Sequence, residues 1–92
     1  MELPANHPVA EALQIIGGER QESYGPPERN FERIAKLWTV LFDIEITAEQ
    51  VGWAMILLKA ARQVHSPKRD NVVDAIGYAA LIGDMEYRRT TH

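Results

Sequence analysis

The stretch from Pro27 to Phe42 constrains the fold most, because its apolar residues recur at the spacing of an amphipathic helix. Charged residues occupy most of the other positions, and Pro27 fits the first turn, where a missing backbone N–H does no harm. No segment of the chain shows the strict alternation of a surface strand, so we expect an all-α fold. The apolar stripe of this predicted helix comprises Phe31, Ile34, Ala35, Trp38, Leu41 and Phe42.

A first helix is predicted before this one. It opens near Pro8, behind a cap supplied by Asn6 or His7. The run Tyr24-Gly25-Pro26-Pro27 must break it, because two prolines fix the backbone and disfavour helix in the residues before them. We therefore expect a tight connection between the first two helices.

A third helix is predicted to follow Thr47, which forms a capping box with Gln50. From Val51 onward, its apolar residues leave almost no polar face before Lys59. A helix of this kind is expected to be central and touched on several sides. Ser66-Pro67 ends it, because proline cannot continue a helix.

A fourth helix is predicted to begin at a cap formed by Asp70 or Asn71. Short links between the predicted helices favour a bundle of about four helices. We expect a single helical domain over residues 1–92, with an ordered core of about 7–88 and a polar C-terminal tail.

The small size of the chain bears on its assembly. It has 92 residues and no cysteine. A chain this short buries a smaller fraction of its surface than a domain of typical size, and neither a disulfide nor a thiolate zinc site can compensate. We therefore expect a homo-oligomer, either a dimer or a tetramer, in which pairing of copies completes the core.

The charge and apolar patterns of the sequence argue against two kinds of partner, nucleic acids and membranes. The net charge of −3 comes from 13 acidic and 10 basic residues scattered along the chain, so no continuous basic surface is offered to a nucleic acid. The longest apolar stretch, around Trp53 to Leu58, is too short to span a bilayer. The cytosol is therefore the expected compartment.

Two charged groups that helix spacing brings together are the main candidates for chemistry. Lys59 and Arg62 lie three residues apart, on one side of the predicted third helix. Asp70, Asp74 and Tyr78 are spaced by four along one face of the next helix. Because the intervening turn is short, the two helices are expected to be antiparallel neighbours whose charged faces can meet.

This cluster has a structural and a functional interpretation. In the structural one, Asp70 is only a helix cap, Asp74 pairs with Arg62, and the ammonium of Lys59 reaches water along its aliphatic stem. In the functional one, the cluster lines a pocket for a phosphorylated ligand. Lys59 and Arg62 then bind the phosphates, and Asp70 and Asp74 hold a Mg²⁺ ion.

A second candidate cluster surrounds the predicted bend between the first two helices. Glu19 and Glu22 share a helix face, where they could bind a divalent ion or simply be solvated. Asn30, next to Phe31, could point inward as a hydrogen-bonding group for a nucleotide base or for the loop around Tyr24. The candidates for a nucleotide pocket are Glu19, Glu22, Tyr24, Asn30 and Tyr78, with Arg33 nearby.

Several short motifs run through residues 18–84. They are Glu19–Pro27, Asn30-Phe31, Ile34–Trp38, Met55–Arg62, Pro67-Lys68, Asp70-Asn71 and Asp74–Ala80. These motifs resemble those of a family of small helical proteins found in bacteriophages. That family is in turn distantly similar to the MazG-like all-α nucleoside triphosphate pyrophosphohydrolases.

The second resemblance implies a MazG-like bundle in which helices supply carboxylates to Mg²⁺ and the enzyme releases pyrophosphate. Those enzymes carry an E-x-x-E pattern on one core helix and an E-x-x-D pattern on the next. This chain has Lys59 and Arg62 where the first pair is expected, and only Asp70 and Asp74 as counterparts of the second. The catalytic carboxylate set is therefore incomplete, and no catalytic residue is assigned.

Two functions follow as hypotheses. The first is a nucleotide pyrophosphohydrolase, or a nucleotide-binding protein, with a degenerate Mg²⁺ site at Asp70 and Asp74. The second is a non-enzymatic phage accessory protein that binds a host protein in the bacterial cytosol and keeps the former active centre for structure.

Overall fold

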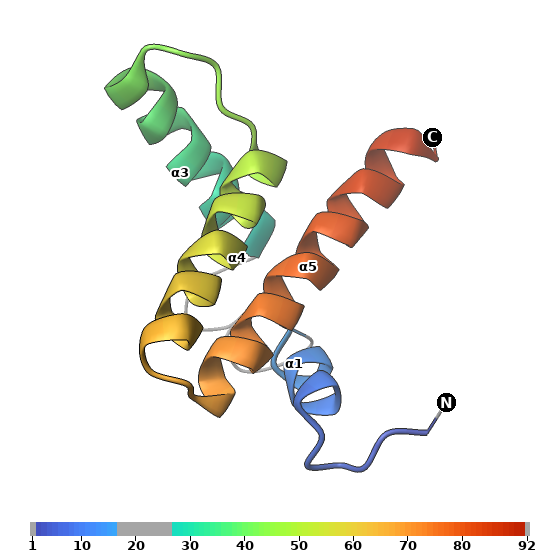
Figure 1. Cartoon of the computed structure of the whole chain (residues 1–92). Coiled ribbons are helices and arrows are strands. Elements are labelled where there is room, and N and C mark those ends of the chain that lie inside the picture. The colour runs from blue at the N-terminus through green and yellow to red at the C-terminus, as the bar shows by residue number, and fades with distance from the viewer. Residues whose placement is uncertain (1, 17–26, 92) are drawn as a thin grey trace.

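The computed structural model describes residues 2–16 and 27–91, and within these ranges it contains four helices and no strand. The helices are α1 (Pro8–Ile16), α3 (Pro27–Phe42), α4 (Ala48–His65) and α5 (Arg69–Thr90). Figure 1 shows α4 between α3 and α5, with α1 beside the first turns of α5. The expected all-α fold is confirmed. The predicted bend at residues 24–26 lies outside the described residues.

Local capping chemistry positions the starts of two helices. The backbone N–H of Val9 donates to Nδ1 of His7 at 3.1 Å, so His7 and not Asn6 caps α1. At α4, the Thr47 N–H donates to Oε1 of Gln50 at 2.9 Å, and the Gln50 N–H donates to Oγ1 of Thr47 at 3.2 Å. The predicted capping box is therefore confirmed.

The core forms where α3, α4 and α5 meet. Phe31 and Ala35 of α3 and Val51 of α4 are buried together. The Phe31 ring lies against the ring of Tyr78 on α5, with centroids 5.8 Å apart. The partly buried residues around this cluster are Ile34, Trp38, Ile46, Ala48, Met55, Tyr78, Leu81 and Met85.

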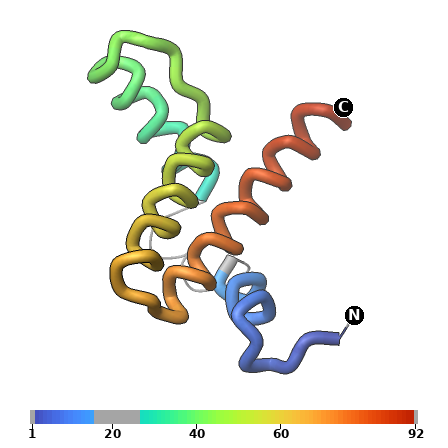
Figure 2. The backbone as a smooth tube through the Cα atoms, in the orientation of Figure 1, coloured from blue at the N-terminus to red at the C-terminus, as the bar shows by residue number. Residues whose placement is uncertain are grey.

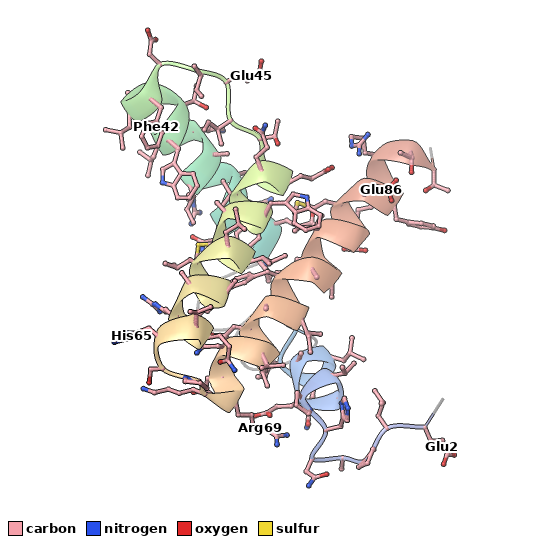
Figure 3. All side chains as sticks on the ribbon, in the orientation of Figure 1. Glu2, Phe42, Glu45, His65, Arg69 and Glu86 are labelled. Carbon is pink, nitrogen blue, oxygen red and sulfur yellow. The ribbon has the colours of Figure 1, made fainter. Side chains whose placement is uncertain are left out.

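The far end of the α3 apolar stripe lies outside this core. Leu41 and Phe42 are largely exposed, because α3 ends there and the chain turns at Asp43, whose φ of 56° is left-handed. Figure 3 shows Phe42 at the end of α3, remote from α5. The expectation that α4 is touched on several sides is wrong for one of them, since Trp53 and Leu57 are also exposed.

The turn from α4 to α5 differs from the prediction in its cap. The C-terminal cap of α4 is Ser66, as expected, but α5 already begins at Arg69 and Lys68 is its N-cap, without a side-chain cap bond. Asn71 is buried, and its amide donates to Oε1 of Gln63 at 3.1 Å and to the Ser66 carbonyl at 3.4 Å. The Asn71 side chain, in the first turn of α5, thus bonds across the connection between α4 and α5. Neither Asn71 nor Asp70 caps α5.

Helix α5 extends further than predicted. It runs to Thr90, so residues 89 and 90 of the expected polar tail are helical. Arg88 pairs with Glu28 of α3, and Arg89 pairs with Glu49 of α4 at 2.9 Å, which fastens the last turns of α5 to the other helices. In the view of Figure 2, both described chain ends lie on the side away from α3.

Gly52 allows a close approach of α4 to the Ile82 side chain of α5. A Cβ added at Gly52 would lie 2.6 Å from Cγ1 and 2.9 Å from Cδ1 of the buried Ile82. We expect Gly52→Ala to lower the free energy of unfolding by about 1 to 2 kcal/mol, because the cost of overpacking exceeds the gain in helix propensity.

Gly83→Ala is the matched control. It adds the same methyl group to α5, where nothing lies within 4 Å, and is expected to raise the free energy of unfolding by up to about 1 kcal/mol. Urea unfolding of both variants checks the prediction, and effects of the same sign would contradict it.

Candidate functional site

The centre of the predicted charge cluster is an ion pair between α4 and α5. Nζ of Lys59 lies 2.9 Å from Oδ2 of Asp74. Their side chains are only 13% and 11% exposed, so the pair is nearly buried between the two helices. A charge-assisted bond of this length neutralises both groups within the protein.

The two outer members of the cluster are placed differently. Arg62 and Asp70 are both exposed, and neither forms an ion pair with any residue in ranges 2–16 and 27–91. The structural interpretation of the sequence paired Asp74 with Arg62 and left Lys59 to water. That assignment is wrong by one helical turn, because the packing of α4 on α5 brings Lys59 to Asp74.

Asp70 and Asp74, the two residues predicted to hold Mg²⁺, have different surroundings. Asp74 is engaged by an ammonium group, and Asp70 is exposed one turn away. Within the described ranges, no three Asp, Glu, His or Cys side chains are grouped closely enough to hold a metal ion. A divalent cation at Asp74 would also be repelled by Lys59 at close range.

The structure describes two of the five nucleotide-pocket candidates, Asn30 and Tyr78. Tyr78 is partly buried and packs on Phe31 in the core, so its ring supports the fold. Asn30 is exposed and does not point inward as the sequence suggested, and Arg33 is exposed as well. The other three candidates, Glu19, Glu22 and Tyr24, lie outside the described residues.

A second ionic cluster, which the sequence analysis missed, joins α3 to α5. The guanidinium of Arg88 lies 2.8 Å from the carboxylate of Glu28 and 2.8 Å from that of Asp84. The spacing of four between Asp84 and Arg88 is a sequence signal for their pairing. No short-range pattern predicts the pairing of Glu28 with Arg88, because the two residues are 60 positions apart.

The environment of Glu28 raises its pKa. Burial is the largest cause, and a hydrogen bond with the Asp84 carboxyl adds to it, whereas the positive charge of Arg88 acts in the opposite direction. The folded protein therefore holds the Glu28 proton more tightly than the unfolded chain does.

This raised pKa predicts a pH dependence of stability. The free energy of unfolding of the wild type, relative to Glu28→Gln, is expected to rise as the pH falls from neutral towards 4.5, the unperturbed value. The stabilisation is complete below that value and is lost as the pH rises through the folded pKa. Urea unfolding at several pH values tests it, with Glu45→Gln in the exposed loop after α3 (Figure 3) as the matched control. An equal response of the two variants would contradict the prediction.

The helices and the internally neutralised pair define an all-helical protein with an ion-paired centre. Comparison with known proteins identifies its family. The family described as "Domain of unknown function (DUF6378)" matches residues 8–86, and the chain belongs to this family. None of the helices in the described ranges has the length and apolarity needed to cross a membrane.

Two curated relatives come from bacteriophages. The chain is 43% identical over 77 residues to the "Gene 55 protein" of Mycobacterium phage L5, covering 82% of this chain and 49% of the relative. It is 40% identical over 75 residues to the "Gene 55 protein" of Mycobacterium phage D29, covering 80% and 50%. The chain thus spans about half the length of these relatives. No solved structure matches it significantly.

Proposed function

We propose that this protein is a non-enzymatic phage accessory protein, built on a MazG-like helical scaffold, that acts in the host cytosol by binding a host protein. The observation that carries the proposal is the ion pair between Lys59 and Asp74. The carboxylate that a MazG-like enzyme would use for metal binding is neutralised by an ammonium group of the same chain. The former centre then holds α4 to α5 and is not free for catalysis.

Its similarity to phage proteins and its surface also support this proposal. The two curated relatives are phage proteins. The described part of the chain exposes large apolar side chains on α3, namely Leu37, Val40, Leu41 and Phe42, which favours association with other proteins over a closed monomeric surface.

The first test is a catalytic one. With Mg²⁺ or Mn²⁺ present, we expect no release of pyrophosphate from a panel of ribonucleoside and deoxyribonucleoside triphosphates. We also expect no thermal shift on adding them. Turnover that is lost in Asp74→Asn, while the fold is kept, would overturn the proposal.

The second test concerns the partner. Affinity purification of the tagged chain from phage-infected bacteria, followed by native mass spectrometry, is expected to give a complex with one host protein at fixed stoichiometry. Recovery of the chain without any host protein in stoichiometric amount would contradict the proposal.

The exposed Arg62 favours a second candidate, nucleotide binding without hydrolysis. It leaves a guanidinium available to a phosphate one turn from Lys59. This candidate predicts a thermal shift with nucleoside triphosphate that is lost in Arg62→Ala and kept in Lys36→Ala, which removes an exposed cation on α3. No shift in the wild type would exclude it.

A further inference from the structure

The chain exposes more surface than a folded monomer of its size. Its accessible surface is 6857 Å², whereas a monomer of 10.4 kDa typically has about 5,400 Å². Its radius of gyration of 14.1 Å likewise exceeds the value of about 12 Å typical of a compact chain of 92 residues. The excess is about 1,450 Å² per chain. Two chains that each buried half of this excess would form an interface of about 1,450 Å², the standard size of a stable protein–protein interface.

The outer side of α4 carries a regular apolar stripe, which we name the α4 seam: Trp53, Leu57, Ala60 and Val64. Their spacing of 4, 3 and 4 is that of the apolar seam of a coiled coil. The three large side chains are 56%, 69% and 87% exposed, and Ala60 is exposed as well. This seam points away from the core, because Val51 and Met55 face inward and Trp53 lies midway between them in sequence.

Nothing in the described part of the chain covers the α4 seam. Helix α1 packs on α5 and contacts neither α3 nor α4. The segment from Gln50 to Leu58 has no charged residue that would favour leaving this side of the helix in water. Helix α3 adds a second exposed apolar stripe, made of Leu37, Val40 and Leu41.

We propose that the α4 seam pairs with the α4 seam of a second copy of this chain in an antiparallel, two-fold symmetric dimer. The two-fold axis then passes between Leu57 and Ala60, at the middle of the seam. Trp53 meets Val64 of the partner subunit, and Leu57 meets Ala60 of the partner subunit. Each large side chain is thus opposed by a smaller one, which allows close packing of two identical helices.

This pairing does not depend on the proposed function. It uses the side of α4 away from the Lys59–Asp74 pair, so it would hold equally for a protein that binds a nucleotide. Failure of the dimer would leave the nucleotide and host-protein tests unaffected, and the reverse is also true.

The first experiment measures the oligomeric state of the full chain by sedimentation velocity. The wild type is expected to sediment as a dimer and Leu57→Glu as a monomer, because a carboxylate at the seam would be buried against apolar groups. Val64→Lys, at the end of α4 where the side chain is 87% exposed, is expected to weaken the dimer while keeping the helical circular dichroism. Tyr87→Glu changes a similarly exposed side chain on α5 and is expected to remain dimeric.

The second experiment tests the antiparallel direction by disulfide cross-linking, since the chain has no cysteine of its own. In the proposed dimer, the two copies of position 64 lie about 16 Å apart along the helices, and so do the two copies of position 53. Val64→Cys alone and Trp53→Cys alone are therefore expected not to cross-link, whereas an equimolar mixture gives the mixed disulfide dimer.

Three results would overturn the proposal. The first is a monomeric wild type, which would leave the α4 seam to a different protein. The second is a dimer that persists in both Leu57→Glu and Val64→Lys. The third is efficient cross-linking of each single cysteine variant with itself, which would indicate parallel helices.

Discussion

Asp74→Ala is expected to lower the free energy of unfolding by about 3 to 5 kcal/mol, because it leaves the ammonium of Lys59 without its carboxylate in a nearly buried position. Urea unfolding followed by circular dichroism measures this loss. The size of the effect separates a structural role from a ligand-binding one. A carboxylate kept only for metal binding would be replaced at little cost to the fold.

The matched control removes both charges together. In Lys59→Met/Asp74→Leu the two side chains are replaced by apolar groups of similar volume, and such replacements of buried pairs are often neutral or stabilising. We expect the double variant to be at least as stable as the wild type, which makes the two changes strongly non-additive. A double variant as unstable as Asp74→Ala would show that Asp74 acts through groups other than Lys59.

The features that short-range interactions determine are the ones best predicted from the sequence. The capping box of Thr47 and Gln50 and the end of α4 at Ser66 depend on residues within one or two turns, and both are found. The start of α5 was misplaced because Asn71 bonds to Gln63 and Ser66. Its side chain is therefore used across the turn, which residue type alone does not reveal.

Long-range packing decides the features that the sequence left open. Lys59 and Arg62 are one turn apart, so a small shift of α4 along α5 determines which of them reaches Asp74. Arg88 and Arg89 join the helical end of α5 to other helices, through partners 60 and 40 positions away. When those partners are unknown, charged residues at the end of a chain predict a solvated tail.

Because α4 is almost entirely apolar, its sequence does not show which side faces the core and which side is exposed. The sequence indicated a helix surrounded by protein, and in the described chain the side bearing Trp53 and Leu57 is left exposed. A second apolar side can be explained by a second copy as well as by a larger core. Sequence spacing does not distinguish these cases, because both require apolar residues at the same positions.

Phe31→Ala is expected to lower the free energy of unfolding by about 3 to 5 kcal/mol, because Phe31 joins three helices in a core that is small. The ring is 4% exposed, lies against Tyr78 of α5, and has its Cε2 3.4 Å from where a Cβ of Gly52 on α4 would be.

Phe42→Ala removes the same side chain from the exposed end of the same helix and is the matched control, with an expected loss below about 1 kcal/mol. Urea unfolding at equal protein concentration compares the two variants. Equal losses would mean that Phe42, at the exposed end of α3, contributes to the folded state as much as the buried Phe31 does. A small loss in Phe31→Ala would instead mean that α3 contributes little to the stability of the α4–α5 pair.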